Sequence, residues 1–340
     1  MEQQELASVS AWLTGVVEGF VGPIEVTPFT TGQSNPTYLL RGGSGDYVLR
    51  RKPHGVLLKS AHAVDREFRV QRALAGTGVP VPEVLALCDD DSVLGSMFYV
   101  MKHVPGRSFV DPTMPEETNE TRAAIMRSMG QTLAAIHDVD VQAVGLGDYG
   151  PPGNYYARQL ARWSKQYHAS ATEDQPAMLA LMQWLEGAMP QDDGQRGLVH
   201  GDFRIDNLLF DPNGAACVAV LDWELSTLGH PYADLAGVIM QWQLPPGTEG
   251  RGVAGVDRAA LGLPTDAEFV ADYCARRGIA EIPDFGFYLA FAFFRMAAIL
   301  QGVKKRALDG NAANPDKAMR LGAYVPQFAE LGLEARTWHG

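Results

Sequence analysis

The chain has 340 residues, of which 46% are hydrophobic and 20% are charged, and its formal net charge is −12 at pH 7. This acidity opposes non-specific attraction to nucleic acid or to an anionic membrane surface, so we expect neither as a partner. The three cysteines, Cys88, Cys217 and Cys274, are far apart in sequence, which argues against a disulfide framework or a zinc site. The acidic N-terminus lacks the basic start of a signal peptide, and we therefore expect a cytoplasmic protein.

The first hundred residues have the pattern of a small β-rich domain. Apolar residues at helical spacing predict a helix over 6–20, and a second helix is expected after Ser60. Between and after these helices, β-type segments alternate with turns, including a glycine-rich turn at 42–46 and an acidic turn at 89–91. The predicted strands span 25–29, 37–41, 47–50, 81–88 and 97–106. Because the last strand ends in Pro-Gly, we expect an N-lobe over residues 1–105 and a C-lobe over residues 106–340.

Beyond residue 115 the pattern becomes helical. The predicted helices comprise one ending near His137, others over 155–167, 178–189, 266–277, 285–306 and 316–331, and one that begins at Pro231. The most apolar stretch, 285–300, is shorter than a membrane-spanning helix and contains Arg295, so we interpret it as a buried helix. We interpret His137 as a structural histidine. Asp234 either ties the helix after Pro231 to an earlier loop or stabilises the N-terminus of that helix.

Two short apolar segments in the middle of the chain, which we interpret as buried strands, end in polar residues. The first is followed by His200-Gly201-Asp202, the second is followed by Asp222, and Asn207 lies between them. In protein kinases, this order and the five-residue spacing between Asp202 and Asn207 place a catalytic aspartate and two magnesium ligands. Magnesium prefers hard oxygen ligands, and one carboxylate and one amide suffice beside nucleotide phosphates. We therefore expect Asp202 to orient a hydroxyl group, and Asn207 and Asp222 to bind magnesium.

Other interpretations of this motif remain open. A His-Gly-Asp turn can cap a strand, and a buried aspartate can be a hydrogen-bond acceptor only. A metallohydrolase that uses His200, Asp202 and Asp222 is the other chemical interpretation, although no further cluster at metal-ligand spacing supports it. The short segment between Asp222 and Pro231 leaves no room for a regulatory activation loop, and Gly201 stands where regulated protein kinases have arginine. Both features favour a small-molecule kinase over a protein kinase.

The motif His-Gly-Asp-x-x-x-x-Asn with a later strand-end Asp resembles that of the aminoglycoside phosphotransferase and choline kinase-like superfamily. Segments 32–38, 47–53 and 61–67 are similar to the branch associated with acyl-CoA dehydrogenases. This resemblance covers nearly the whole chain. It implies an α+β, two-lobed protein-kinase-like fold with a small antiparallel-β N-lobe and a larger, mostly helical C-lobe. The implied activity is ATP- and Mg2+-dependent transfer of phosphate to a hydroxyl group of a small molecule.

The resemblance also implies a nucleotide site in the N-lobe. The loop 30–36 occupies the place of a phosphate-covering loop, although it is no Gly-x-Gly-x-x-Gly sequence. In this superfamily, a basic residue on the third strand holds the phosphates and a glutamate on the next helix steadies it. Arginine stands where lysine is usual, and a lysine two residues later shares its side of the strand. The implied nucleotide contacts are Ser34, Arg50 or Lys52, Glu67, and the backbone groups of Lys102 and Val104.

The sequence leaves the phosphate acceptor open. The branch resemblance implies a hydroxy acid or a hydroxyacyl-CoA, and a functional link to an acyl-CoA dehydrogenase. A CoA thioester needs basic residues near the entrance, for which the candidates are Arg158, Arg162, Lys165 and the Lys304-Lys305-Arg306 cluster. The superfamily name instead suggests an aminoglycoside or amino alcohol as acceptor. A nucleotide-binding regulatory protein without turnover is an alternative of another class, which the arginine at position 50 motivates.

Overall fold

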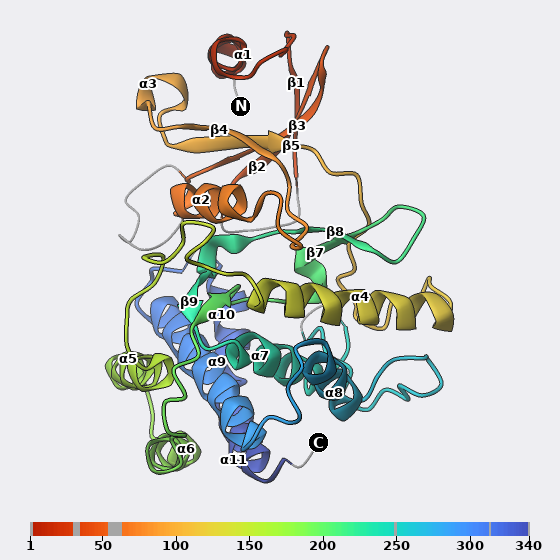
Figure 1. The fold of residues 1–340 in the computed structure, drawn as a ribbon. Coiled ribbons are helices and arrows are strands. Elements are labelled where there is room, and N and C mark those ends of the chain that lie inside the picture. Colours follow the sequence, from red (N-terminus) through yellow and green to blue (C-terminus); the bar gives the residue numbers. More distant parts are fainter. Residues whose placement is uncertain (1–2, 30–34, 54–62, 248–249, 313, 339–340) are drawn as a thin grey trace. The chain divides into compact units, whose positions relative to one another are not determined.

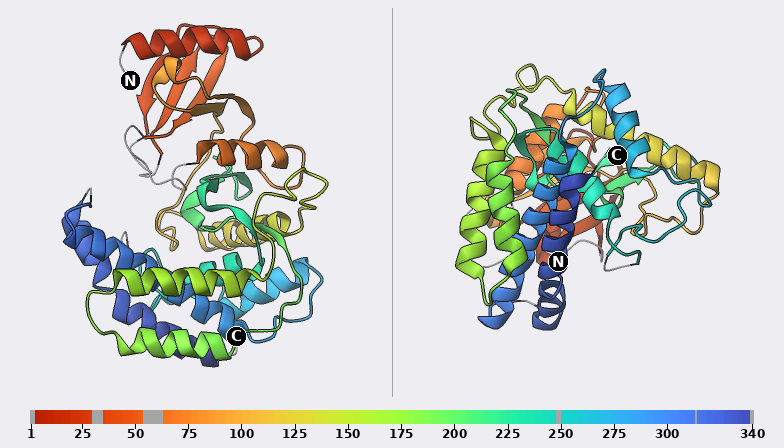
Figure 2. Two further views of the ribbon diagram at one scale, coloured as in Figure 1. Left: turned by 90° about the vertical axis from the view of Figure 1, so that its left-hand side faces the viewer. Right: turned by 90° about the horizontal axis from the view of Figure 1, so that it is seen from below.

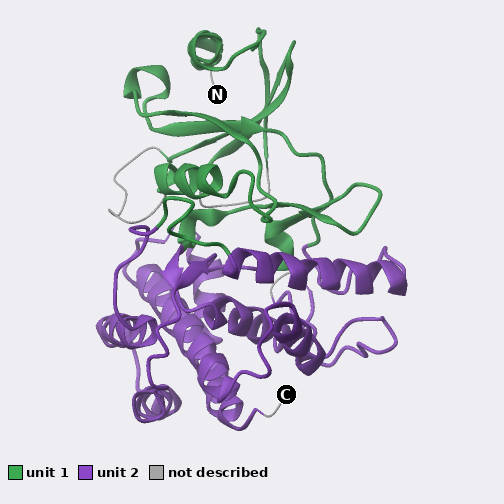
Figure 3. Cartoon of the chain, viewed as in Figure 1, with its two compact units in different colours: residues 1–109, 139–146, 204–226 green, residues 110–138, 147–203, 227–340 purple. Residues whose placement is uncertain are grey.

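The computed structural model describes residues 3–29, 35–53, 63–247, 250–312 and 314–338. The chain divides into two compact units (Figure 3). Unit 1 comprises residues 1–109, 139–146 and 204–226, and unit 2 comprises residues 110–138, 147–203 and 227–340. Unit 1 thus combines the expected N-lobe with two later segments, one of which contains Asn207 and Asp222.

Unit 1 is built on a five-stranded antiparallel sheet in the order β1-β2-β3-β5-β4. Its strands are β1 (Glu25–Pro28), β2 (Thr37–Gly42), β3 (Gly45–Arg51), β4 (Val84–Cys88) and β5 (Phe98–Lys102). The hairpin between β2 and β3 closes with Gly42 opposite Gly45. Gly45 has φ +132°, a conformation that residues with a Cβ rarely adopt, which explains a glycine-rich turn here.

Helices cover both faces of this sheet (Figure 1). On one face, α1 (Gln3–Val16) packs with Leu49 and Phe98, and α3 (Asp91–Leu94) joins the same core. On the other face, Val64 of α2 (Val64–Leu74) packs against Val48 and Tyr99. Because side chains alternate along a strand, Arg50 shares the α2 side of β3 with Val48.

The segment 204–226 adds a second, two-stranded sheet to unit 1. Its strands are β7 (Leu208–Phe210) and β8 (Cys217–Val220), and the 3-10 turns η1 (Ile205–Asn207) and η2 (Trp223–Leu225) flank them. The backbone of Arg107 forms an isolated antiparallel β-bridge with Phe210. The N–H of Val220 donates to the carbonyl of Pro80 at 2.8 Å. Turn η2 contacts α2. These contacts bring the polar residues of the segment to the α2 side of the large sheet.

Unit 2 is mainly helical (Figure 2). Its helices are α4 (Asn119–His137), α5 (Tyr155–Ser170), α6 (Pro176–Gly187), α7 (Tyr232–Trp242), α8 (Asp266–Arg276), α9 (Phe285–Leu308), α10 (Pro315–Gly322) and α11 (Val325–Glu334), followed by the turn η3 (Ala335–Thr337). Two short strands, β6 (Gly197–Val199) and β9 (Thr227–Gly229), pair antiparallel. Helix α9 contacts α5, α6, α7, α10 and α11, and it forms the centre of this unit.

Helix α9 is longer than the apolar stretch from which we predicted it. It has 24 residues, and by length and composition it could cross a membrane, but 72% of its most apolar window is buried inside the protein. Packing against five neighbouring helices accounts for this apolar composition. The expectation of a segment too short to span a membrane is therefore wrong in length, whereas the expectation of a buried helix is confirmed.

Two other local predictions are wrong. The expected single helix over 316–331 is two helices, α10 and α11, because Pro326 lies in the first turn of α11. In a helix interior, proline removes a hydrogen bond and clashes with the preceding turn, whereas the first turn tolerates it. The acidic turn at 89–91 leads into the short helix α3, where the Asp90 carboxylate caps the N-terminus by accepting from the N–H of Ser92.

Candidate active site

The His200-Gly201-Asp202 turn follows β6 in unit 2, and α7 of the same unit holds it. The Asp234 carboxylate, in the first turn of α7, accepts hydrogen bonds from the N–H of His200 at 2.6 Å and of Gly201 at 2.8 Å. Of the two interpretations of Asp234, the structure thus confirms the tie to the earlier loop. Gly201 has φ +86°, which favours glycine. The N–H of Asp202 donates to Nδ1 of His200 at 3.3 Å, so the turn that presents Asp202 is fixed on both sides.

His137 supports Asp234 from the interior of unit 2. Its Nε2 lies 3.3 Å from Oδ2 of Asp234, and its Nδ1 lies 2.6 Å from the Tyr273 hydroxyl. Burial lowers the pKa of His137, which favours the neutral ring. For Asp234, burial acts to raise the pKa, but the hydrogen bonds from His137 and from the backbone outweigh it, and the net pKa is lowered. Asp234 is therefore ionised, and His137 has the structural role that we expected.

In unit 1, Arg50 of β3 lies among three carboxylates, those of Glu67, Asp222 and Glu224. Its Nε is 2.8 Å from Oε2 of Glu67, although the N–H does not point along that line, and its Nη2 contacts Oδ1 of Asp222. The same Nη2 lies 4.0 Å from Glu224. The side chain of Arg50 is 14% exposed and that of Glu67 only 1%, so these charges interact with little screening by solvent.

The electrostatics of this cluster follow from burial and proximity. Burial raises the pKa of Glu67 to about 7; the Arg50 guanidinium opposes this shift, and the charge of Asp222 adds to it. For Arg50, burial acts to lower the pKa, but Glu67 and Asp222 outweigh it and the net pKa is raised. Asn35 donates to Glu67 at 2.8 Å and to Glu224 at 3.3 Å, and the Tyr99 hydroxyl donates to Glu67 at 3.1 Å. Glu67 thus stays poised between its charged and neutral forms while Arg50 stays charged.

Asp222 and Asn207 lie at the same end of the β7–β8 pair. Asn207 precedes β7, Asp222 follows β8, and the N–H of Leu221 donates to the carbonyl of Asn207 at 2.9 Å. Asp222 has φ +64° and ψ 55°, a left-handed conformation that is uncommon outside glycine and that concentrates at functional sites. The backbone therefore turns sharply at Asp222, and the carboxylate faces Arg50.

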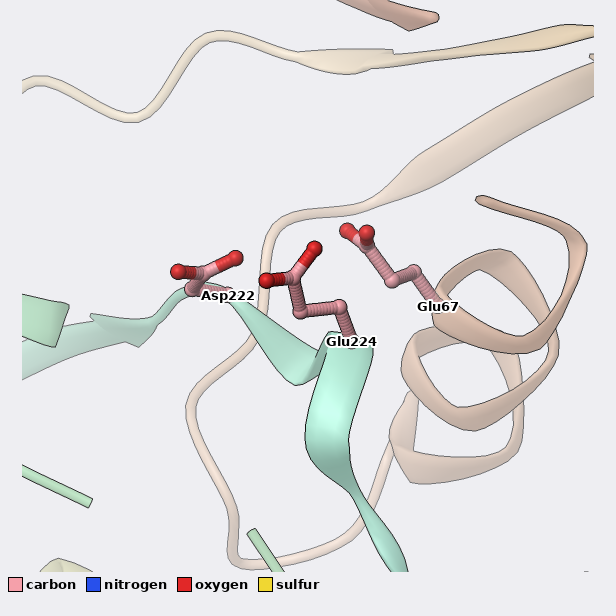
Figure 4. A group of neighbouring side chains, drawn as sticks. All are labelled: Glu67, Asp222 and Glu224. Atoms are coloured by element: carbon pink, nitrogen blue, oxygen red, sulfur yellow. The ribbon is translucent and has the colours of Figure 1, made fainter. Parts of the chain in front are cut away.

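A cluster of three carboxylates in unit 1 includes one residue, Glu224, that we did not predict. Carboxylate oxygens of Glu67, Asp222 and Glu224 lie within 4.8 Å of one another and could together hold a metal ion (Figure 4). Glu224 lies in η2, where one turn of 3-10 helix returns its side chain toward Asp222. The sequence shows that Glu224 follows Asp222 by two residues. The alternation of a β-strand, however, does not indicate that a tight turn follows it and brings the two side chains together.

The remaining predicted nucleotide contacts lie elsewhere in unit 1. Lys52 pairs with Asp65 of α2 at 3.6 Å, on the same side of the sheet as Arg50. Lys102 is exposed, its Nζ lies 2.6 Å from Glu83, and its N–H donates to the Glu83 carbonyl. Val104 is half-buried just after β5. Ser34 lies outside the described residues.

A cavity of about 160 Å³ lies in unit 2, away from the His200-Gly201-Asp202 turn. Asp193, His230 and Tyr288 are among its lining residues, and Nε2 of His230 is 3.3 Å from Asp193. It adjoins the end of the β6–β9 pair at which β6 begins, whereas Asp202 follows the other end. The cavity is therefore separate from the turn that presents Asp202.

Two features together define the kinase-like phosphotransferase fold. One is an antiparallel sheet whose third strand pairs an arginine with a glutamate of the following helix. The other is a helical region that holds a His-Gly-Asp turn. The model of the phosphotransferase enzyme family matches residues 25–285, and the chain belongs to this family.

Similar proteins agree with this assignment. The chain is 48% identical over 320 residues to acyl-CoA dehydrogenase family member 10 of Mus musculus, a match that covers 94% of this chain and 30% of that protein. The chain spans less than half the length of the curated relatives that it matches here. A crystal structure from Ralstonia eutropha with the provisional name aminoglycoside phosphotransferase is 47% identical, with a TM-score of 0.89 over 97% of both chains.

A more distant structure shares the fold alone. It is a thermostable mutant of aminoglycoside phosphotransferase APH(4)-Ia in complex with ADP and hygromycin B. This structure is 20% identical with a TM-score of 0.62, and the match covers 98% of this chain and all of that one. The predicted fold class is confirmed: the chain has the kinase-like fold, with an antiparallel-sheet N-terminal region and a helical C-terminal region.

Proposed function

We propose that this phosphotransferase uses ATP and Mg2+ to phosphorylate a hydroxyl group of a small molecule. The observation that carries the proposal is the cluster in unit 1 in which Arg50 joins Glu67 of α2 to Asp222. In kinases, a strand cation paired with a helix glutamate contacts the nucleotide phosphates, and a nearby strand-end aspartate holds magnesium. A structural salt bridge alone does not require the left-handed backbone that Asp222 adopts.

Asp202 acts as the catalytic base in this proposal. The acceptor oxygen forms a bond to the γ-phosphorus of ATP, and the bond from that phosphorus to the β–γ bridging oxygen breaks, so that ADP leaves with the electron pair. The hydroxyl proton passes to the Asp202 carboxylate. The hydrogen bonds of Asp234 to His200 and Gly201 hold the turn in place, which reduces the reorganisation needed at the moment of transfer.

The donor groups of unit 1 fit Mg2+. Asp222 and Glu224 offer carboxylate oxygens within 4.8 Å of each other, Asn207 offers an amide oxygen, and hard oxygen donors are what this ion prefers. When bound, Mg2+ would neutralise charge on the phosphates. Arg50, steadied by Glu67, would hold a phosphate by its planar fork.

Three further nucleotide contacts belong to the proposal. Lys52, which directly follows β3 and pairs with Asp65 on the Arg50 side of the sheet, is the second candidate for the phosphates. We also assign the phosphate-covering role to Ser34, and adenine contacts to the backbone groups of Lys102 and Val104. Support for ATP comes from the structural neighbour with the same fold that holds ADP.

The proposed acceptor is a hydroxy acid or a hydroxyacyl-CoA, with an acyl-CoA dehydrogenase as a functional partner. Its support is the name and the 48% identity of the mouse relative. The alternative acceptor, an aminoglycoside or an amino alcohol, has its support in the provisional name of the Ralstonia eutropha structure. The other alternative is a regulatory protein without turnover. Its only support is Arg50, whose guanidinium contacts the Asp222 carboxylate in the structure.

Coupled ADP release tests these functions together. The panel contains 3- and 4-hydroxyacyl-CoAs, free hydroxy acids, choline, homoserine and aminoglycosides, with ATP and Mg2+. We expect stimulation by one acceptor class, and a loss of kcat of about 10²- to 10⁴-fold in Asp202→Asn. ATP affinity, measured by equilibrium binding, should stay near the wild-type value because Asp202 is not assigned to the nucleotide. Unchanged turnover in Asp202→Asn would refute the assignment, and ATP binding without stimulation by any acceptor would favour the regulatory function.

A further inference from the structure

Three guanidinium groups of unit 2 gather where α5 faces α9. Arg158 and Arg162 lie four residues apart on α5 and so share one face of the helix, and Arg295 lies on α9, which contacts α5. The guanidinium carbons of Arg162 and Arg295 lie 5.2 and 6.0 Å from the centre of the Trp163 ring. Burial raises the pKa of the Tyr155 hydroxyl, and the charges of all three arginines oppose that rise without cancelling it. The three cations therefore form one cluster around Tyr155 and Trp163.

These arginines form no ion pair with a carboxylate of any residue that the structure describes. Arg158 donates to the carbonyls of Pro152, at 2.7 Å, and of Gly153. Arg295 donates to the carbonyl of Gly201 at 3.2 Å. Among described residues, Arg162 has the ring contact with Trp163 as its recorded interaction.

Other cations of α9 contrast with this cluster. Lys304 pairs with Glu173, and Lys305 pairs with Asp309. In a chain with a net charge of −12, acidic partners are plentiful, and cations close to one another usually find them. Three adjacent guanidiniums without a carboxylate partner among the described residues produce a local positive potential that suits an anion.

The position of the cluster connects it with phosphoryl transfer. Gly201, whose carbonyl accepts the Arg295 hydrogen bond, directly precedes Asp202 in the same unit. We propose that Arg158, Arg162 and Arg295, with Trp163, bind an acidic group of the phosphate acceptor, a carboxylate or a phosphate, and so select anionic over cationic acceptors. This inference rests on the proposed function and specifies its acceptor. Arginine suits the task because its planar fork pairs with both kinds of acidic group, and a polycationic acceptor is repelled at the same place.

Binding measurements without ATP test the cluster independently of turnover. The probes are coenzyme A, 3-hydroxybutyrate and the uncharged methyl ester of 3-hydroxybutyrate, each measured by titration calorimetry on the full chain. We expect Arg162→Gln, at an exposed position, to raise the Kd of an anionic probe about fivefold, and Arg295→Gln, at a half-buried one, to raise it about tenfold. The matched control is Arg127→Gln, an exposed arginine of α4 that has no assigned binding role and should leave Kd unchanged.

The two anionic probes, coenzyme A and 3-hydroxybutyrate, distinguish phosphate from carboxylate as the group that the cluster binds. Weaker binding of coenzyme A alone assigns the cluster to phosphate, weaker binding of 3-hydroxybutyrate alone assigns it to carboxylate, and both results support the proposal. The proposal is overturned if the wild type binds neither anion or if both variants keep the wild-type Kd. It is also overturned if binding of the methyl ester is weakened equally, or if Arg127→Gln weakens anion binding as much as the two variants do.

Turnover with an anionic acceptor separates recognition from support of the loop. Recognition predicts a raised KM with little change in kcat in Arg162→Gln. If Arg295→Gln lowers kcat equally for charged and uncharged acceptors at constant KM, Arg295 only supports Gly201, and its part of the proposal falls. Anion binding that depends on these arginines, without ADP release for any acceptor, would leave the site standing and refute the proposed function instead.

Discussion

Replacement of Asp234 by asparagine tests whether α7 holds the turn that presents Asp202. The side chain of Asp234 is 1% exposed, and its carboxylate accepts hydrogen bonds from two backbone N–H groups, those of His200 and Gly201. In Asp234→Asn the side chain keeps its size, but one acceptor oxygen becomes an NH2 group. One of the two buried N–H groups then faces a donor and has no acceptor.

The expected cost follows from these two hydrogen bonds. A buried N–H left without a partner costs about 1–3 kcal/mol. The bond that remains changes from charge-assisted to neutral, which removes about 1 kcal/mol more. We therefore expect the free energy of unfolding to fall by about 2–4 kcal/mol, which lowers Tm by about 5–15 °C for a unit of this size. Because the turn also loses its fixed position, kcat should fall together with stability.

Urea unfolding followed by tryptophan fluorescence, together with ADP release at a temperature where both proteins are folded, measures the two effects. The matched control is Asp272→Asn, which removes a 38%-exposed carboxylate paired with Arg276 one helical turn away on α8. Such surface pairs contribute about 0.5 kcal/mol or less, so the control should unfold near the wild-type midpoint. If Asp234→Asn unfolds at the same midpoint as the control, the two backbone hydrogen bonds do not stabilise the turn, and the reasoning is wrong.

Three other substitutions test the ion cluster and the turn. Arg50→Met leaves the three carboxylates without their cation, so the free energy of unfolding should fall by about 3–5 kcal/mol in thermal unfolding. Millimolar Mg2+ should partly restore this loss. If Mg2+ raises the Tm of the variant no more than that of the wild type, the cluster is not a cation site. The folded pKa of Glu67 is raised from 4.5 to about 7, so its contribution to stability is fully present below 4.5 and is lost as pH rises through about 7. Glu67→Gln should flatten that part of the pH dependence in urea unfolding, and an identical slope in both proteins would contradict the shift. Gly201→Ala should cost about 1–2 kcal/mol because position 201 has φ +86°, and a wild-type urea midpoint would show that the turn tolerates a Cβ.

The features that the sequence predicted correctly depend on neighbours along the chain. The β2–β3 hairpin has alternating side chains on both sides of a glycine turn, and the alternation also places Arg50 and Arg51 on opposite sides of β3. Arg50 pairs with Glu67 of α2, whereas Arg51 pairs with Glu5 of α1. The spacing of Asp202 and Asn207 is local as well, so it could be recognised without a structure.

Features that depend on distant parts of the chain could not be predicted. The carbonyl of Gly201 accepts from Arg295, which is 94 positions later, and no local pattern indicates that pair. The apolar segment before His200 is strand β6, as expected, but its partner β9 has only three residues, too few for a detectable alternation. Asp234 had two equally good interpretations because both place an aspartate in the first turn of α7; only the position of the His200 N–H decided between them.

The central position of α9 also has a consequence for biosynthesis. The ribosome makes α9 before α10 and α11, two of the helices that cover it, and roughly 25 residues separate the end of α9 from the end of α11. At about 5–20 residues per second, a long apolar helix stays partly uncovered for seconds in the nascent chain. During that interval it has the composition that chaperones and membrane-insertion machinery bind. We therefore expect the completion of α11 to be the step that commits the new chain to its folded form.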